Sequence, residues 1–188
     1  MSKLSQLAAV AAALGATFEN GSEDSDSARG RVVMPDGLKF FMITGGYSHK
    51  GKIHIDSSFP NYQHHADGGM RAMSQRDIMP GNTDYFDGIN VSDTKTPEQI
   101  AKDITRRFLP VYAPIWARAV DYVAKQAAYW QGYNDVAKVA EEVLTPFGYS
   151  NKVVQARVNY NNGRTVRVEV DNLDADKLRK LAAFLGTL

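Results

Sequence analysis

The stretch from Thr94 to Tyr133 constrains the fold more than any other part of this sequence. Its beginning has the pattern of a helix N-terminus, because Thr96 suits the N-cap, Pro97 the first helical position and Gln99 the third residue of a capping box. Apolar residues then recur at helical spacing, at Ile100, Ile104 and Phe108. The pattern predicts an amphipathic helix that begins at Thr96.

Pro110 is expected to end or kink that helix, because proline has no backbone N–H to donate and its ring crowds the preceding turn. A second helix is expected from about residues 113–114, with inward-facing side chains at Ile115, Ala119, Tyr122 and Val123. We therefore expect a rigid frame of two helices joined at a proline. One of its faces is apolar, and the other carries basic and aromatic side chains.

The N-terminal run MSKLSQLAAVAAALGATF predicts a helix that ends at Gly15. Its buried stripe is expected at Leu4, Leu7, Ala11 and Leu14. We expect a helix of the mature protein rather than a signal peptide, because an alanine-rich run is only weakly hydrophobic. No segment approaches the roughly 20 apolar residues that span a membrane.

Residues 31–34 and 38–44 flank a Pro-Asp-Gly turn and predict a β-hairpin. A further strand is expected over Lys52–Ser57, with Ile53 and Ile55 on the face opposite His54 and Asp56. The polar run 19–27 predicts a mobile surface loop. Residues 59–90 show no periodicity apart from a short helix expected over 70–78. Long loops of this kind are often functional, so a site is expected there.

A further helix is expected over 134–144, ended by Pro146 and Gly148. Two strands, 153–160 and 164–170, flank Asn161-Asn162-Gly163 and predict a second hairpin. A last helix is expected over 174–185. The whole pattern predicts an α+β fold with an antiparallel sheet built from two hairpins plus an extra strand, and about five helices packed mainly on one face. We expect a single domain over 1–188. If it has two lobes, they are expected at 1–58 and 94–188, separated by a long loop over 59–93.

The chain of 188 residues carries a formal net charge of +1, which does not require nucleic acid or a membrane as a partner. It contains no cysteine, so disulfides, thiolate chemistry and cysteine-based zinc sites are excluded. This composition suits the cytoplasm. Neither the GxGxxG nor the GxxxxGK[ST] phosphate-binding pattern is present, and no GxSxG nucleophile elbow is present either. We expect no cofactor.

The strongest binding candidates are basic and aromatic side chains along the proline-jointed helices, at Arg106, Arg107, Tyr112, Trp116, Arg118 and Trp130. Guanidinium groups beside aromatic rings neutralise phosphates and stack on bases. The same residue types dominate the binding energy of protein interfaces. The alternative is that the rings are core residues and the arginines form a solvated face.

Two further charged patches are candidates. Arg157 and Arg167 are expected on the outer face of the second hairpin, where a basic β-ribbon can contact nucleic acid. Glu23, Asp24 and Asp26 form an acidic patch that can mimic phosphates toward a basic channel. The alternative for the acidic patch is a solubilising loop.

A metal site is the enzymatic alternative. Its ligands would be His54 and Asp56 from one strand face and His64, His65 and Asp67 from the following loop. Imidazole and carboxylate ligands bind transition metals, and a bound metal can activate water for hydrolysis. The sequence has no recognised spacing such as HExxH, so the competing interpretation is a set of surface histidines.

The segment IAKDITRRFLPVYAPIWARAV, residues 100–120, resembles small accessory proteins of phages and plasmids, including anti-defence proteins of the anti-CRISPR kind. The resemblance implies binding rather than catalysis and assigns no functional residue. We therefore expect a non-enzymatic inhibitor encoded by a mobile element. It would bind a host protein or nucleoprotein complex in the cytoplasm of the host cell. The alternatives are the metal-dependent hydrolase and a direct nucleic-acid-binding protein.

Overall fold

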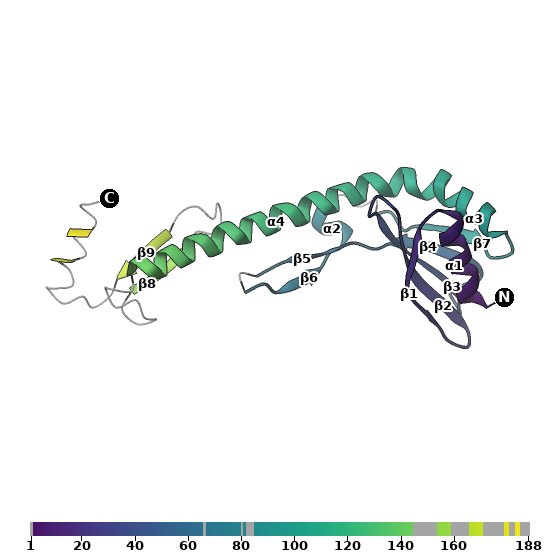
Figure 1. The fold of residues 1–188 in the computed structure, drawn as a ribbon, viewed down its shortest axis with the longest axis horizontal. Coiled ribbons are helices and arrows are strands. Elements are labelled where there is room, and N and C mark those ends of the chain that lie inside the picture. The colour runs from purple at the N-terminus through teal and green to yellow at the C-terminus, as the bar shows by residue number, and fades with distance from the viewer. Residues whose placement is uncertain are drawn as a thin grey trace. The chain divides into compact units, whose positions relative to one another are not determined.

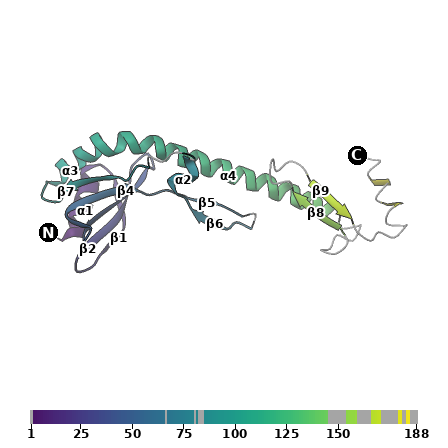
Figure 2. The ribbon, with the colours of Figure 1, turned by 180° about the vertical axis from the view of Figure 1, so that it is seen from behind.

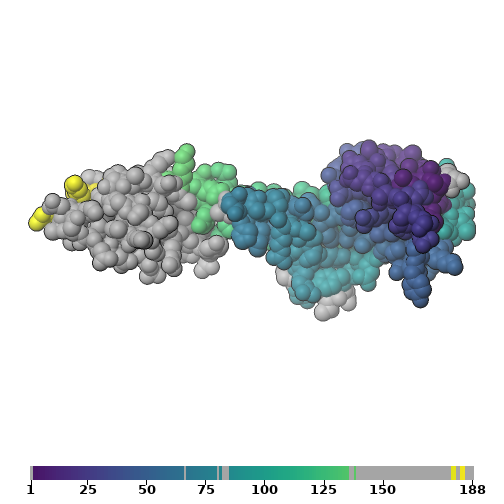
Figure 3. Space-filling view, turned by 90° about the horizontal axis from the view of Figure 1, so that it is seen from below, coloured from purple at the N-terminus to yellow at the C-terminus, as the bar shows by residue number. Residues whose placement is uncertain are grey.

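Figure 1 shows the computed structural model of the chain. Its backbone is described for residues 2–65, 67–79, 81, 85–144, 154–158, 166–170, 179–180 and 183–184, and side chains are described for the residues coloured in Figure 3. The chain divides into two compact units, Met1–Asn61 with Ala72–Val123 and Tyr62–Arg71 with Ala124–Leu188. The single domain over 1–188 stays a prediction.

The first unit begins with helix α1 (Lys3–Ala13), as the sequence predicts. Ser2 is its N-cap, and the Ser2 hydroxyl accepts a hydrogen bond of 3.1 Å from the Ser5 amide. Gly15 follows the helix with a φ of +67°, a left-handed conformation that glycine adopts without steric cost. The buried residues of α1 are Leu7, Val10 and Ala11.

An antiparallel sheet of five strands, in the order β1-β2-β3-β4-β7, forms the main layer of this unit. The predicted first hairpin and third strand are present in it, while its two outer strands were not predicted. The strands are β1 (Thr17–Glu23), β2 (Ser27–Val33), β3 (Lys39–Gly45), β4 (His49–Ser57) and β7 (Ile89–Ser92).

Alternation along the central strands gives this sheet one buried face. Met42 pairs with Ile55, and Thr44 pairs with Ile53, and all four side chains are buried. Met42, Ile53 and Ile55 belong to one apolar cluster with the buried residues of α1 and of the long helical run after β7. Both helices therefore cover the same face of the sheet, as Figures 1 and 2 show for α1.

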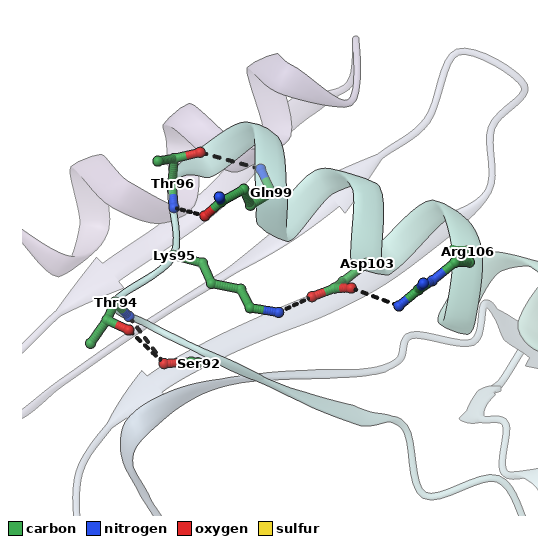
Figure 4. A network of polar contacts seen from close by, with 7 residues as sticks. All are labelled: Ser92, Thr94, Lys95, Thr96, Gln99, Asp103 and Arg106. Carbon is green, nitrogen blue, oxygen red and sulfur yellow. Dashed lines mark hydrogen bonds and ion pairs between the residues drawn. The ribbon is translucent and has the colours of Figure 1, made fainter.

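The long helical run begins with α3 (Pro97–Asp103). The predicted capping box is confirmed: the Gln99 amide donates to the Thr96 hydroxyl at 3.3 Å, and the Thr96 amide donates to the Gln99 side chain at 3.1 Å (Figure 4). A π turn (Ile104–Phe108) follows α3, and α4 (Leu109–Leu144) continues directly from it.

Pro110 does not end the helix, so the expected end there and the separate helix expected from about residues 113–114 were wrong, while a kink at Pro110 stays a prediction. The π turn ends at Phe108, two residues before Pro110, and the Leu109 amide donates to the carbonyl of Ile104, five residues earlier. A wider turn relieves the contact that a proline ring makes with the preceding turn of a regular helix. Pro114 also lies inside α4. The separate helix expected over 134–144 is the last part of α4 within the described residues.

The π turn also keeps the buried residues of the run in line. Ile104, Phe108 and Tyr112 are all fully buried and lie four residues apart. In a regular α-helix a four-residue step advances by about 400°, so a row at this spacing drifts by about 40° at each step. The π turn has more residues per turn and offsets this drift. It leaves three consecutive residues exposed, Thr105, Arg106 and Arg107.

The prediction of a loop over residues 19–27 was wrong, because β1 extends to Glu23 and β2 begins at Ser27. β1 is a polar edge strand with a bulge between Glu19 and Ser22, so it lacks the alternation that predicts a strand. Its inward contact comes from Phe18. A Cβ atom at Gly30 would lie 2.1 Å from the Phe18 ring, so the ring occupies the space of a side chain on β2.

Residues 59–93 hold more regular structure than expected. β5 (Asn61–Gln63) and β6 (Met70–Ala72) form a two-stranded sheet. The helix expected over 70–78 is present only as α2 (Gln75–Ile78), and β7 joins the main sheet. Short polar strands have no clear period, which is why the sequence pattern did not reveal them.

In the second unit Trp130 and Tyr62 are buried, and the Trp130 ring N–H donates to the carbonyl of Gln63 at 3.0 Å. β8 (Val154–Val158) and β9 (Val166–Val170) form the predicted second hairpin. They make a two-stranded sheet of their own, so the expectation that both hairpins build one sheet was wrong.

Within the helix expected over 174–185, residues 179, 180, 183 and 184 are helical. The predicted turn 161–163 and the stop at 146–148 lie outside the described residues.

The fold is α+β with antiparallel sheets, as predicted, but the described residues form fewer helices than the expected five or so. The difference arises because helices expected on either side of Pro110, and again from Asn134, are one continuous run. No helix in the described part of the chain combines the length and apolarity needed to cross a membrane.

Candidate functional site

A groove lies in the first unit between the C-terminal end of α1 and the helical run formed by α3, the π turn and the start of α4. It is a depression open to solvent, with a volume of about 650 Å³, within the usual size range of ligand-binding clefts. We call it the π-turn groove. Its lining residues are Ala13, Leu14, Met34, Glu98, Ala101, Lys102, Thr105, Arg106 and Leu109.

One side of the groove is formed by side chains of the helical run. Glu98, Lys102, Thr105 and Leu109 follow one another at intervals of three and four residues, so they share one face of the run. Arg106 joins them from the π turn. The floor is apolar, because Leu14, Met34 and Leu109 are partly buried and pack against the core. The groove is therefore an apolar depression with a polar rim along one side.

The charges on this rim are unequal. Lys102 is exposed and makes no hydrogen bond or ion pair with the part of the chain that the structure describes. Glu98 lies in the first turn of α3, where hydrogen bonds from its own backbone amide and from the Thr96 side chain lower the pKa of its carboxyl. The helix N-terminus thus stabilises the one acidic charge on the rim. Of the two cations on the rim, Lys102 is the one without an ion pair to the described part of the chain, because Arg106 pairs with Asp103.

Asp103 positions Arg106 (Figure 4). Its side chain is only 11% exposed and lies 2.5 Å from the Lys95 ammonium and 3.4 Å from the Arg106 guanidinium. The hydrogen bond from Lys95 is the largest cause that lowers the pKa of the Asp103 carboxyl. Lys95 is the closer partner, while the Arg106 side chain is 72% exposed and available to a binding partner.

The structure separates the candidate residues of the helical run. Arg106, Arg107 and Arg118 are exposed, and only Arg106 lines the groove. Tyr112 is fully buried, and Trp116 packs half-buried against the core. The expectation that the Tyr112 ring points outward to a partner was wrong, because Tyr112 falls on the face of the helix that covers the sheet. Contact of the half-buried Trp116 with a partner stays a prediction.

The remaining basic and aromatic candidates belong to the second unit. Trp130 is buried with a hydrogen bond to the β5 backbone, so its ring is also a packing residue rather than an exposed one. Arg157 and Arg167 are paired directly across the β8–β9 ladder. Their contact with nucleic acid stays a prediction.

The acidic candidates surround the β1–β2 turn. The Asp24 carboxylate accepts hydrogen bonds from the amides of Asp26 and Ser27, at 2.9 and 2.7 Å, which lower the pKa of Asp24. The Glu23 carboxylate accepts from the Lys3 amide at 3.0 Å. Asp24 therefore closes the hairpin turn, and Glu23 joins the hairpin to α1. Phosphate mimicry by Glu23, Asp24 and Asp26 stays a prediction.

The histidine candidates fall in two places. His54 of β4 stacks on His49 with ring centroids 4.9 Å apart, and its Nδ1 lies 3.2 Å from the Asn90 side-chain oxygen. Asp56 accepts a hydrogen bond from the Ser57 amide. His64, His65 and Asp67 lie in the turn between β5 and β6. Within the described residues, no group of three or more His, Asp or Glu side chains is arranged to hold a metal ion.

Sequence reasoning missed the groove itself. Glu98, Lys102 and Thr105 are outward positions of a predicted amphipathic helix, so the pattern placed them on a solvated face. Leu14 and Met34 come from the ends of α1 and β2, and nothing local in the sequence indicates that they meet α3. The run of three polar residues, Thr105 to Arg107, shortly before Pro110 is the sequence signal that could have drawn attention to this turn.

No protein-family model, no curated protein and no solved structure matches this chain. The candidate site therefore rests on the geometry and chemistry of the chain's own residues.

Proposed function

We propose that this chain is a non-catalytic binding protein that recognises a host protein, alone or within a nucleoprotein complex. The observation that carries the proposal is the π-turn groove, where an apolar floor lies beside the exposed cations Lys102 and Arg106. An apolar depression with a charged rim combines burial, which supplies affinity, with charge, which supplies partner selection.

The neighbouring surface supports the same function. Arg107 and Arg118 extend the positive charge along the exposed side of the helical run. Arginine is enriched at binding hot spots because its planar guanidinium forms several directed hydrogen bonds. The capping box, the Lys95–Asp103 pair and the core beneath hold this helix in one conformation, so a partner meets a preorganised surface.

The function is tested by capturing partners from host lysate on the immobilised full chain, with mass spectrometry to identify them. A variant with Arg106→Glu, Arg107→Glu and Arg118→Glu is compared with Arg76→Glu, an exposed arginine on α2 outside this surface. We expect the triple variant to lose the captured partner and Arg76→Glu to retain it. Capture that is insensitive to the triple variant would contradict the proposed surface.

Two measurements separate this function from the other classes. Elemental analysis that finds a stoichiometric bound metal, together with hydrolytic activity, would replace it with the metal-dependent enzyme. A mobility shift with short single-stranded DNA at low salt, lost steeply as salt is added, would indicate direct nucleic-acid binding instead.

A further inference from the structure

We infer that the π-turn groove binds an acidic peptide segment of the partner, one that presents a large apolar side chain beside carboxylates. This inference rests on the proposed binding function and names the chemistry of its partner. It follows from three properties of the groove: its floor, its rim and the kind of side chain that lines it.

The floor selects an apolar side chain. Leu14, Met34 and Leu109 pack against the core but keep part of their surface exposed in the groove. When an apolar side chain of a ligand packs on this floor, the apolar surface of the ligand and that of the floor are both removed from water, which favours binding. Methionine adapts its shape to the group it contacts, which suits a site for a protruding side chain.

The rim selects negative charge. Lys102 and Arg106 lie about one helical turn apart on the same edge, so two carboxylates of an extended segment can reach them together. Among the described residues that line the groove, Glu98 is the one acidic side chain and offsets one of the two cations. The charge of the nearby Asp103 is balanced by Lys95 at 2.5 Å, with Arg106 farther away at 3.4 Å. The rim therefore has a positive excess toward a ligand. Charge complementarity favours an acidic segment over a basic or neutral one.

The lining favours peptide over nucleic acid. Single-stranded nucleic acids are held by aromatic rings that stack on bases beside a basic track. The described residues that line the groove include no aromatic ring, and the nearby rings of Tyr112 and Trp116 face the core. Two cations over an aliphatic floor instead match carboxylates that flank a leucine, methionine or phenylalanine.

The test selects short random peptides displayed on phage against the immobilised full chain, with counter-selection on the Arg106→Glu variant. We expect the enriched peptides to combine Asp or Glu with a large apolar residue. Enriched peptides that are basic, or purely apolar, or equally retained by Arg106→Glu, would overturn the inference, and so would a lack of enrichment.

Fluorescence anisotropy with the enriched peptide then compares matched variants. Arg106→Glu is expected to weaken binding at least about tenfold, which corresponds to about 1.4 kcal/mol. Arg76→Glu makes the same charge change at an exposed arginine of α2, outside the groove and its neighbouring basic surface, and is expected to change affinity less than about threefold. Thr105→Gln lengthens an exposed groove side chain without adding charge and is expected to weaken binding.

Equal weakening by Arg106→Glu and Arg76→Glu would show general electrostatic attraction and overturn the groove as the site. A matched peptide with serine in place of its apolar residue must bind more weakly, or the floor has no role. If peptides fail while lysate capture still depends on the arginines, the binding function stands and the groove inference is lost. If capture fails as well, the proposed function fails. Thermal unfolding of each variant confirms that it is folded.

Discussion

The hydroxyl of Tyr112 donates a hydrogen bond of 2.8 Å to the carbonyl oxygen of Lys39, and it accepts one of 3.0 Å from the amide of Ser58. One phenol therefore joins α4 to the first residue of β3 and to the residue after β4. The side chain is fully buried, and burial raises the pKa of the Tyr112 hydroxyl, so it stays protonated and able to donate.

Replacing Tyr112 with phenylalanine is expected to lower the free energy of unfolding by about 1–3 kcal/mol, because the Ser58 amide and Lys39 carbonyl lose their partner. Urea denaturation measures this change. The control is Tyr47→Phe, which removes a hydroxyl from a fully exposed ring and is expected to have no measurable effect. A similar, small effect at both positions would contradict the structural role of the Tyr112 hydroxyl.

The backbone at Gly88, directly before β7, lies close to the backbone of β4 at Ile55. Its φ is +79°, and a Cβ atom there would lie 2.1 Å from the carbonyl oxygen of Ile55. Gly37→Ala is the matched control, because Gly37 has a φ of +86° but open space around it. We expect Gly37→Ala to cost about 1–2 kcal/mol for the left-handed conformation alone. Gly88→Ala is expected to cost about 1–3 kcal/mol more, because a backbone oxygen must move. Equal losses in urea denaturation would show that the strands adjust freely.

His49 makes stability depend on pH. Burial is the main cause that lowers its pKa below the ordinary value of 6.5, and the neighbouring His54 contributes. Below about 6.5 the unfolded state binds a proton at this position more readily than the folded state, so the free energy of unfolding falls as the pH falls. In His49→Gln the decline between about pH 7 and pH 5 is expected to be shallower. Identical pH profiles for the two proteins would contradict this assignment.

The Lys95–Asp103 pair is expected to contribute about 0.5–1 kcal/mol, because Lys95 is 42% exposed and solvent screens the interaction. A double-mutant cycle with Lys95→Met and Asp103→Asn measures this coupling, which should shrink with added salt. The lowered pKa of Asp103 means that its contribution is present above about pH 4 and is lost as the pH falls through its folded pKa. Coupling that is independent of salt would point to packing rather than charge.

Local patterns predicted much of the first unit. The Thr96–Gln99 capping box, the stop at Gly15 and the alternation of Ile53 and Ile55 each depend on residues a few positions apart, and the structure confirms them. The polar edge strand β1 was missed because it is specified by pairing with β2 rather than by its own alternation. The prediction of an outward aromatic face was wrong for Tyr112 and Trp130, which are buried. The reason is related, because helical periodicity does not by itself indicate which face of a helix packs against the rest of the fold.

Local sequence patterns were sufficient for the start of α3, the end of α1 and the β2–β3 and β8–β9 hairpins, because capping and turn chemistry act between neighbours in the chain. The continuation of the helix through Pro110 depends on long-range packing, because the burial of Ile104, Phe108 and Tyr112 against the sheet favours a π turn over a break. The tertiary structure also decided the candidate site. Leu14, Met34 and Arg106 come from three distant segments, and only the shared core beneath them brings them to one groove.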